Sequence, residues 1–409
     1  MNIIINPKDK ILLGDPIHIQ VKTESESPVL IHLRRYYFDG DIDYSFAEFK
    51  PADGFVDTET SKPISGSYSE SDISGLFWSQ RNTSFELDLD IDFLSELTKE
   101  DQGYFIVDVF QDETQECFKW LIERVSAEVK ELVIDNNRIQ GKLYYKESSK
   151  PQPLVIHLAG EPGIDYIEVN AKLMASKGIA SLALPICGYK NLPDLFKEIP
   201  LEQIMNTIDY VAALENIDSN RIGLFGSTRG AELAFLIGSK RNDLKLIIAA
   251  NPCDVVNQSV VKQMTTSKSS WSWEGKSLPY SKVKKSKVFK LYTNRIVSNQ
   301  ASQMMKSVYL HETATQLIPV EQITAKVLLL AGESDDRWDS MMMAARIKSK
   351  INCEVVSYSN TGHVLGGPGC LSTMGFEQLS FALGGSPETN GKSQHQSWKL
   401  IIDFIKKNL

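Results

Sequence analysis

One short segment has the residues of a covalent catalyst placed between a predicted strand and a predicted helix. In "FGSTRGAEL" (225–233), Gly226 and Gly230 give the small residues that a nucleophile elbow needs on both sides of its turn. The elbow pattern G-x-S-x-G has its nucleophile at the middle position, which here is Thr228, while Ser227 comes one residue early. The residues alone leave open a threonine nucleophile, a serine nucleophile in a shifted register, and an inactive site.

A carboxylate and a histidine follow in the order that such a site requires. Asp335 and Asp336 come after the apolar run 326–332, and either carboxylate could orient an imidazole. His363 comes after the next run, 354–359, where a general base would lie. A single histidine or aspartate of this kind is usually structural, but all three groups lie at the predicted carboxyl ends of strands. Together they predict a catalytic site of the triad type.

The site also needs two backbone N–H groups to stabilise the negative oxygen of a tetrahedral intermediate. Arg229, the residue after the predicted nucleophile, would supply one of them. Gly160 and Glu161, in the loop "HLAGEPG" (157–163), are the candidates for the other. The carboxylate of Glu161 would have to turn away from that oxygen.

The C-terminal part of the chain, 127–409, has the pattern of a catalytic α/β domain with a mostly parallel, doubly wound sheet. Its apolar runs are typical of strands buried on both faces, and helical periodicity separates them. The predicted strands cover 154–159, 179–185, 222–226, 244–250, 326–332 and 354–359, and the clearest predicted helices are 201–214 and 397–409. Residues 251–320 are too long for an ordinary connection, and we interpret them either as an insertion that shapes a pocket or as a purely structural excursion.

Residues 1–126 have the alternating pattern of a β-sandwich. The predicted strands are 17–23, 29–38, 84–91 and 103–111, and the polar stretch 39–75 is expected to be a long surface connection.

Composition excludes several classes of protein. The net charge of −8 over 409 residues argues against general nucleic-acid binding. Neither a secretory leader nor an apolar run of membrane-spanning length is evident, and five scattered cysteines fit a reducing compartment, so a cytoplasmic location is expected. The histidines lack metal-ligand spacing, so no metal or cofactor is expected. A lysine cluster at 282, 284, 285, 287 and 290 is either a solvated loop or a dock for a phosphorylated carrier or an acidic protein.

Several motifs together resemble the family of acyl-CoA thioesterases and bile acid-CoA:amino acid N-acyltransferases. They are "IGLFGSTRGAEL", "AGESDDRW", "YSNTGHV", "SWKLIIDFIKKNL" and, in the first half, "GSYSESDISGLFWS". The resemblance implies an immunoglobulin-like N-terminal domain followed by an α/β-hydrolase domain. It places Thr228 at the nucleophile position, Asp335 at the acid and His363 at the base.

Members of that family act on acyl-CoA thioesters, mostly by hydrolysis when the nucleophile is serine and by transfer to an amino acid when it is cysteine. This chain has neither residue at 228, and "GGPG" (366–369) replaces the family's "EPPY". We therefore expect an enzyme that acts on a small-molecule acyl thioester of the acyl-CoA type and that hydrolyses the thioester or transfers the acyl group through Thr228. The alternatives are an acyltransferase that uses an acyl carrier protein and a catalytically weak binding protein.

Overall fold

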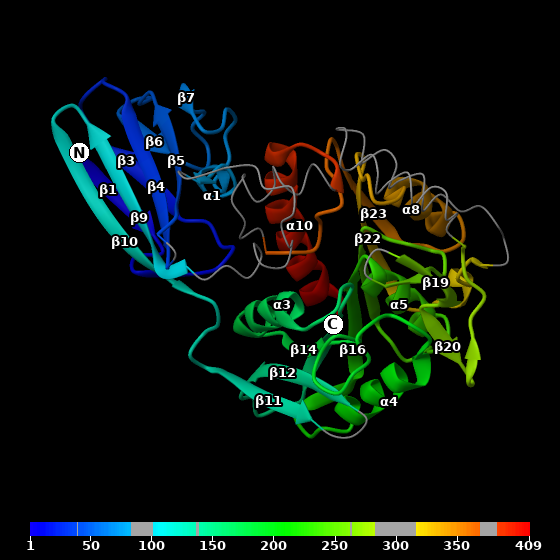
Figure 1. The fold of residues 1–409 in the computed structure, drawn as a ribbon. Coiled ribbons are helices and arrows are strands. Elements are labelled where there is room, and N and C mark those ends of the chain that lie inside the picture. The colour runs from blue at the N-terminus through cyan, green and yellow to red at the C-terminus, as the bar shows by residue number, and fades with distance from the viewer. Residues whose placement is uncertain (39, 83–100, 136–138, 262–263, 283–315, 369–382) are drawn as a thin grey trace. The chain divides into compact units, whose positions relative to one another are not determined.

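A computed structural model describes residues 1–409 except 39, 83–100, 136–138, 262–263, 283–315 and 369–382 (Figure 1). The chain divides into two compact units, one that contains Met1–Ser126 and one that contains Ala127–Gly366. Ser386–Gln396 belongs to the first unit and Ser397–Leu409 to the second, a division that the sequence pattern does not predict.

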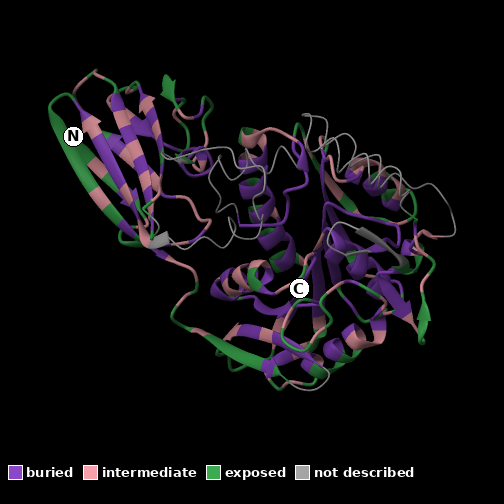
Figure 2. Cartoon of the chain, viewed as in Figure 1, coloured by how far each residue is buried: buried purple, intermediate pink, exposed green. Residues whose placement is uncertain are grey.

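The first unit is built from two β-sheets. One has the strand order β1-β3-β6, from Asn2–Asn6, His18–Lys22 and Phe55–Asp57. The other has the order β2-β10-β9-β4-β5-β7, with β8 also paired to β5; its strands are Lys10–Leu12, Thr114–Glu123, Asp101–Gln111, Val29–Tyr37, Ile42–Phe49, Ser65–Gly66 and Arg81–Asn82. Alternate residues of β4 are buried, among them Val29, Ile31 and Leu33, as a sheet with one face on a core requires (Figure 2).

The prediction of one long connection over 39–75 is wrong. This stretch contains β5, β6 and β7, followed by the short helix α1 (Gly75–Trp78). The buried face of β5, "IDYSFAEF", includes the polar residues Asp43 and Ser45, so its apolar residues do not mark the face that packs on the core. The predicted strand 84–91 lies outside the described residues.

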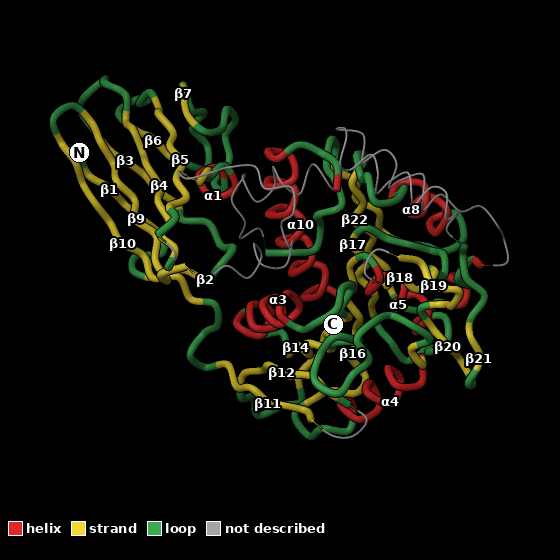
Figure 3. The backbone as a smooth tube through the Cα atoms, viewed as in Figure 1, coloured by secondary structure: helices red, strands yellow, loops and turns green. Residues whose placement is uncertain are grey.

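The second unit is built on an eight-stranded sheet of the order β11-β12-β14-β13-β16-β17-β22-β23 (Figure 3). The strands are Val129–Asp135, Gln140–Lys146, Ala180–Leu184, Gln152–Leu158, Ile217–Ser227, Leu246–Ala250, Lys326–Gly332 and Glu354–Tyr358. From β14 to β23 all neighbours are parallel, whereas β12 is antiparallel to both of its neighbours. This order, with its second strand reversed, is the α/β-hydrolase sheet, and the predicted fold of this part is confirmed.

Helices follow the parallel strands, and α3, α4, α5 and α8 contact them. They are α3 (Asp165–Ser176), α4 (Leu201–Ala212), α5 (Arg229–Gly238), α8 (Ser340–Lys348) and α10 (Pro387–Asn408), with a 3-10 turn at Val320–Gln322. Every residue of α5 is buried, because this helix packs against β16 and β17 on one side and against other segments elsewhere. Within the described part of the chain, no helix combines the length and apolarity needed to cross a membrane.

Part of the long segment 251–320 forms small sheets of its own. The strands β18 (Gln258–Val261) and β19 (Met264–Ser269) pair with each other, and β20 (Trp271–Trp273) pairs with β15 (Ile199–Pro200) and β21 (Lys276–Ser277). Residues 283–315 are outside the description, and of the lysine cluster only Lys282 is described. The predicted pocket and docking roles of this segment stay predictions.

Candidate active site

Thr228 occupies a sharp turn between β16 and α5 and has a backbone conformation that β-branched residues rarely adopt. Its φ is 57° and its ψ is −119°, which costs on the order of 1–3 kcal/mol and requires the surroundings to enforce it. A Cβ built on Gly226 would lie 2.1 Å from the carbonyl oxygen of Gly230, and one on Gly230 would lie 2.2 Å from that of Leu158. Only glycine allows these contacts, so the tight backbone packing that holds the turn depends on both residues.

The structure brings three of the predicted side chains together in one hydrogen-bonded chain. Thr228 Oγ1 lies 2.8 Å from Nε2 of His363, and Nδ1 of the same ring lies 2.8 Å from Oδ2 of Asp335. All three residues are buried, with exposed fractions of 7%, 5% and 1%. Burial in a low-dielectric site strengthens these polar contacts and fixes their geometry.

Asp335, rather than Asp336, is the carboxylate that contacts the imidazole. Its Oδ1 accepts the backbone N–H groups of Arg337 at 2.9 Å and Trp338 at 3.2 Å, and its Oδ2 accepts the hydroxyl of Ser340. These donors stabilise a buried carboxylate and leave Oδ2 facing the ring. Sequence reasoning missed Ser340 and Trp338, although both follow the predicted acid within five residues.

Backbone hydrogen bonds join the acid loop to the base loop through a third segment. Ser334 donates its N–H to the carbonyl of Thr361 at 2.9 Å, and both Asp336 and His363 donate to the carbonyl of Leu383, at 3.2 and 2.9 Å. Gly384 pairs with Asp335 in an isolated bridge. The contribution of Leu383 and Gly384 carries no local sequence signal, because these residues are distant in the chain from both loops.

The predicted oxyanion donors lie around Thr228. Arg229 is the first residue of α5, so its N–H is one of the helix's free N-terminal donors. Gly160 packs against the turn, since a Cβ on it would lie 3.3 Å from the Cβ of Thr228. The side chain of Glu161 forms an ion pair with Arg337, with 2.9 Å between Oε1 and Nη2.

The side chain of Arg229 joins the turn to the segment that includes β18 and β20. Its guanidinium donates to the Ser270 hydroxyl and, at 2.8 Å, to the carbonyl of Gln258. Beside it, fully buried Glu232 accepts from Trp271 Nε1 at 2.6 Å and from the backbone N and Nδ2 of Asn257, both at 2.8 Å. Burial raises the pKa of Glu232, against the opposing effects of Arg229 and these hydrogen bonds. The sequence pattern does not predict this network.

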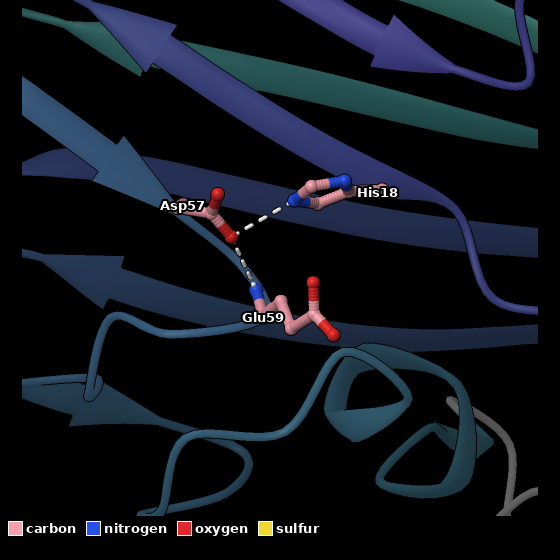
Figure 4. Close-up of side chains that lie close together, drawn as sticks. All are labelled: His18, Asp57 and Glu59. Atoms are coloured by element: carbon pink, nitrogen blue, oxygen red, sulfur yellow. Dashed lines mark hydrogen bonds and ion pairs between the residues drawn. The ribbon is translucent and has the colours of Figure 1, made fainter.

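Two other histidines make contacts that explain them as structural residues. His157 is buried in β13, where Nε2 lies 3.1 Å from Met174 Sδ, and desolvation lowers its pKa to about 3. In the first unit, His18, Asp57 and Glu59 offer ligand atoms within 4.8 Å of one another (Figure 4).

The oxygens of Asp57 in that cluster already accept hydrogen bonds. Oδ1 accepts from His18 Nε2 at 2.9 Å and from the N–H of Glu59 at 2.8 Å, and Oδ2 accepts from Gln20 at 2.7 Å. These bonds join β3 to the end of β6 and explain the arrangement as a local structural contact.

Comparison with known proteins finds relatives over nearly the whole chain. The family model of the BAAT/acyl-CoA thioester hydrolase C-terminal region matches residues 199–409, and the model of the corresponding N-terminal region matches residues 14–132. Acyl-coenzyme A thioesterase 5 of Mus musculus is 23% identical, covering 97% of this chain and 94% of its own length. Mitochondrial acyl-coenzyme A thioesterase 2 of the same species is 24% identical, over 99% of this chain and 89% of its own. Bile acid-CoA:amino acid N-acyltransferase of Mus musculus is also 24% identical, over 97% and 96%. The chain therefore belongs to the BAAT/acyl-CoA thioester hydrolase family.

Proposed function

We propose that this protein is an enzyme that cleaves acyl-CoA thioesters through an acyl ester on Thr228, and that it releases the acyl group to water or to another acceptor. The observation that carries the proposal is the continuous contact from Thr228 Oγ1 through the imidazole of His363 to the carboxylate of Asp335. The names of the relatives, which include thioesterases and N-acyltransferases, support the substrate class.

In this mechanism His363 is neutral at the start, with the proton on Nδ1 donated to Asp335 and Nε2 free to accept the hydroxyl proton of Thr228. As that proton leaves, Oγ1 attacks the thioester carbonyl carbon. The resulting oxyanion accepts hydrogen bonds from the N–H of Arg229 and from that of Gly160 or Glu161. The imidazolium then gives its proton to the departing CoA sulfur, and the acyl group remains on Thr228.

The second half of the cycle reverses these roles. Water or an acceptor gives a proton to His363 as it attacks the ester carbonyl, and Thr228 Oγ1 takes the proton back when its bond to the acyl carbon breaks. A threonine hydroxyl has the same proton and lone pairs as serine, so the chemistry is available to it. No cofactor takes part in these steps.

The alternatives make different predictions for two substitutions. Thr228→Ala should abolish both release of CoA thiol from a panel of straight-chain acyl-CoAs and the acyl adduct detected by intact mass. Ser227→Ala should leave both in place, because the hydroxyl that contacts His363 is that of Thr228. Unchanged turnover in Thr228→Ala would disprove the proposal. Loss of turnover in Ser227→Ala, with the fold intact by circular dichroism, would favour the shifted register. Tight acyl-CoA binding without thiol release would favour a binding protein.

Two finer assignments accompany the proposal. The two sheets of the first unit support an immunoglobulin-like sandwich of the kind that the family resemblance implies. Cys117, Cys187, Cys253 and Cys353 are free thiols, which supports a reducing compartment such as the cytoplasm. An acyl carrier protein as donor is supported by none of the described residues.

A further inference from the structure

Two buried asparagines contact the chain just after His363. Nδ2 of Asn170, on α3, donates to the carbonyl of Gly366 at 3.1 Å. Nδ2 of Asn251, which follows β17, donates to the carbonyl of Leu365 at 3.4 Å. The two asparagines are 1% and 2% exposed. Successive carbonyls of the base loop are therefore bound from two different elements, just beyond the imidazole.

The packing of Gly366 brings the same segment against a residue that holds the nucleophile. Its φ is 102°, and a Cβ built on it would lie 2.9 Å from the Cβ of Ala250 and 3.4 Å from Cζ of Phe225. The carbonyl of Ala250 in turn accepts the N–H of Thr228 at 3.2 Å. The base loop thus packs on the same residue that binds the backbone of the nucleophile.

Asn251 also contacts the acid side of the site through its backbone. Its N–H donates to the carbonyl of Leu330, in β22, at 2.8 Å, and its carbonyl accepts Nε1 of Trp338 at 3.3 Å. Its φ of 49° is left-handed, a conformation that asparagine adopts more readily than most residues. Asn251 therefore joins the strand before the acid loop and the indole beside His363 to the base loop.

The two amides act mainly on orientation. Among the described residues, Oδ1 of neither amide has a hydrogen-bond partner, so the bond to the base loop is the contact that orients each of them. A single hydrogen bond from a buried amide adds only modest net stability. What the pair fixes is the direction of two successive peptide planes, and with it the path of the chain that leaves His363.

We propose that Asn170 and Asn251 are positioning residues that hold the base loop so that Nε2 of His363 stays in line with the nucleophile. The inference rests on the proposed acyl-enzyme at Thr228. Nε2 lies 2.8 Å from Thr228 Oγ1, and a misplacement of about 1 Å in such a contact lowers a rate about 100-fold. Because the amides act through the backbone of the base loop, they affect the rate of acylation and not the affinity for the acyl-CoA.

The test separates rate from affinity in variants of the full-length chain. Asn170→Leu removes one amide with a residue that suits a helix. Asn251→Gly removes the other, accepts the left-handed backbone and keeps the backbone N–H and carbonyl. The control is Asn408→Leu, because Nδ2 of Asn408 makes the same kind of bond, to the carbonyl of Phe404 at 2.8 Å within α10.

The measurement is single-turnover release of CoA thiol with the enzyme in excess over the straight-chain acyl-CoA that the unsubstituted chain cleaves fastest. Varying the enzyme concentration gives a maximal first-order rate constant and a half-saturating concentration. An unfolded fraction raises the half-saturating concentration and leaves the maximal rate constant in place, so a merely structural role changes only the former. Urea titration of each variant shows that it is folded under the conditions used.

The maximal rate constant should fall about tenfold in Asn170→Leu and in Asn251→Gly, as the loss of one orienting hydrogen bond predicts. It should fall about 100-fold in the double variant. The half-saturating concentration should stay within about twofold of that of the unsubstituted chain, because no uniform binding is removed. Asn408→Leu should change neither quantity.

Three outcomes would overturn the inference while leaving the proposed function in place. They are a maximal rate constant that both single variants share with the unsubstituted chain, a change confined to the half-saturating concentration, and an equal loss of rate in Asn408→Leu. If the double variant does not fold, the two single variants decide. Failure of the proposed function itself is distinct, because it would appear as CoA release that persists in Thr228→Ala.

Discussion

The indole of Trp338 lies edge-on to the imidazole of His363, with 4.8 Å between the ring centroids and an angle of 88° between the planes. The same residue donates its backbone N–H to Asp335 at 3.2 Å, and its Nε1 donates to the carbonyl of Asn251 at 3.3 Å. Trp338 thus contacts both the base and the acid, and it is 1% exposed. The plane of the imidazole is set by packing as well as by hydrogen bonding.

Removal of this indole should therefore affect catalysis as well as stability. Trp338→Ala should lower the free energy of unfolding by about 3–5 kcal/mol and lower kcat about 100-fold, because a displaced imidazole no longer aligns with Thr228. Trp338→Phe keeps a ring edge against His363 and should retain most of kcat. Urea titration and steady-state thiol release measure the two effects. A Trp338→Ala enzyme with unchanged kcat would show that the indole only fills space.

The methyl group of Thr228 should slow the enzyme. It restricts the rotation of the hydroxyl in a turn where φ is already positive, and a barrier higher by about 1–3 kcal/mol corresponds to turnover slower by about 5- to 150-fold. Thr228→Ser should raise the single-turnover rate constant for CoA release within that range. The measurement is single-turnover acyl-CoA cleavage, with the acyl adduct followed by intact mass. Slower cleavage in the serine variant would mean that the methyl group positions the nucleophile.

The stability of the second unit should fall in mild acid because of His157. Its pKa is lowered by burial to about 3, so between about pH 6.5 and 3 the unfolded chain binds a proton that the folded chain does not. Each pH unit in that window should cost about 1.4 kcal/mol of unfolding free energy. In the His157→Leu variant, whose new side chain has a similar volume, the free energy of unfolding should fall less steeply between pH 6.5 and 5.5 than in the unsubstituted protein. Urea titrations at each pH measure both slopes. Parallel slopes for the two proteins would contradict this assignment.

The Glu232 network should be essential for holding β20 against α5. Glu232→Ala leaves Arg229, at 3.9 Å, without its nearest carboxylate and removes the acceptor of Trp271 Nε1. Breaking a buried charge pair from one side typically costs 3–5 kcal/mol, so we expect a loss of about that size. Glu198→Ala, which removes an exposed partner of Lys268, is the control and should leave the urea midpoint unchanged. Equal midpoints in the two variants would show that the buried network adds no stability.

Much of the catalytic unit could be predicted from local sequence. The six apolar runs correspond to β13, β14, β16, β17, β22 and β23. The first five are strands with buried interiors, which must be continuously apolar, whereas β23 is a partly exposed edge strand. The edge strand β11 and its neighbour β12 were not predicted, since their mixed polarity resembles that of a loop. In the first unit β5 was missed for the same reason.

The sequence by itself determined the order of the candidate residues along the chain, the small residues of the turn at Thr228, and the family. It could not decide between Asp335 and Asp336, because that choice depends on which carboxylate the loop directs toward His363. Tertiary structure also decided the contacts of Trp338 with His363 and Asn251, the hydrogen bonds from Arg229 and Glu232 to the segment that includes β18 and β20, and the bridge from Glu161 to Arg337. Each of these joins segments distant in the chain, which only the order of the strands in the sheet brings together.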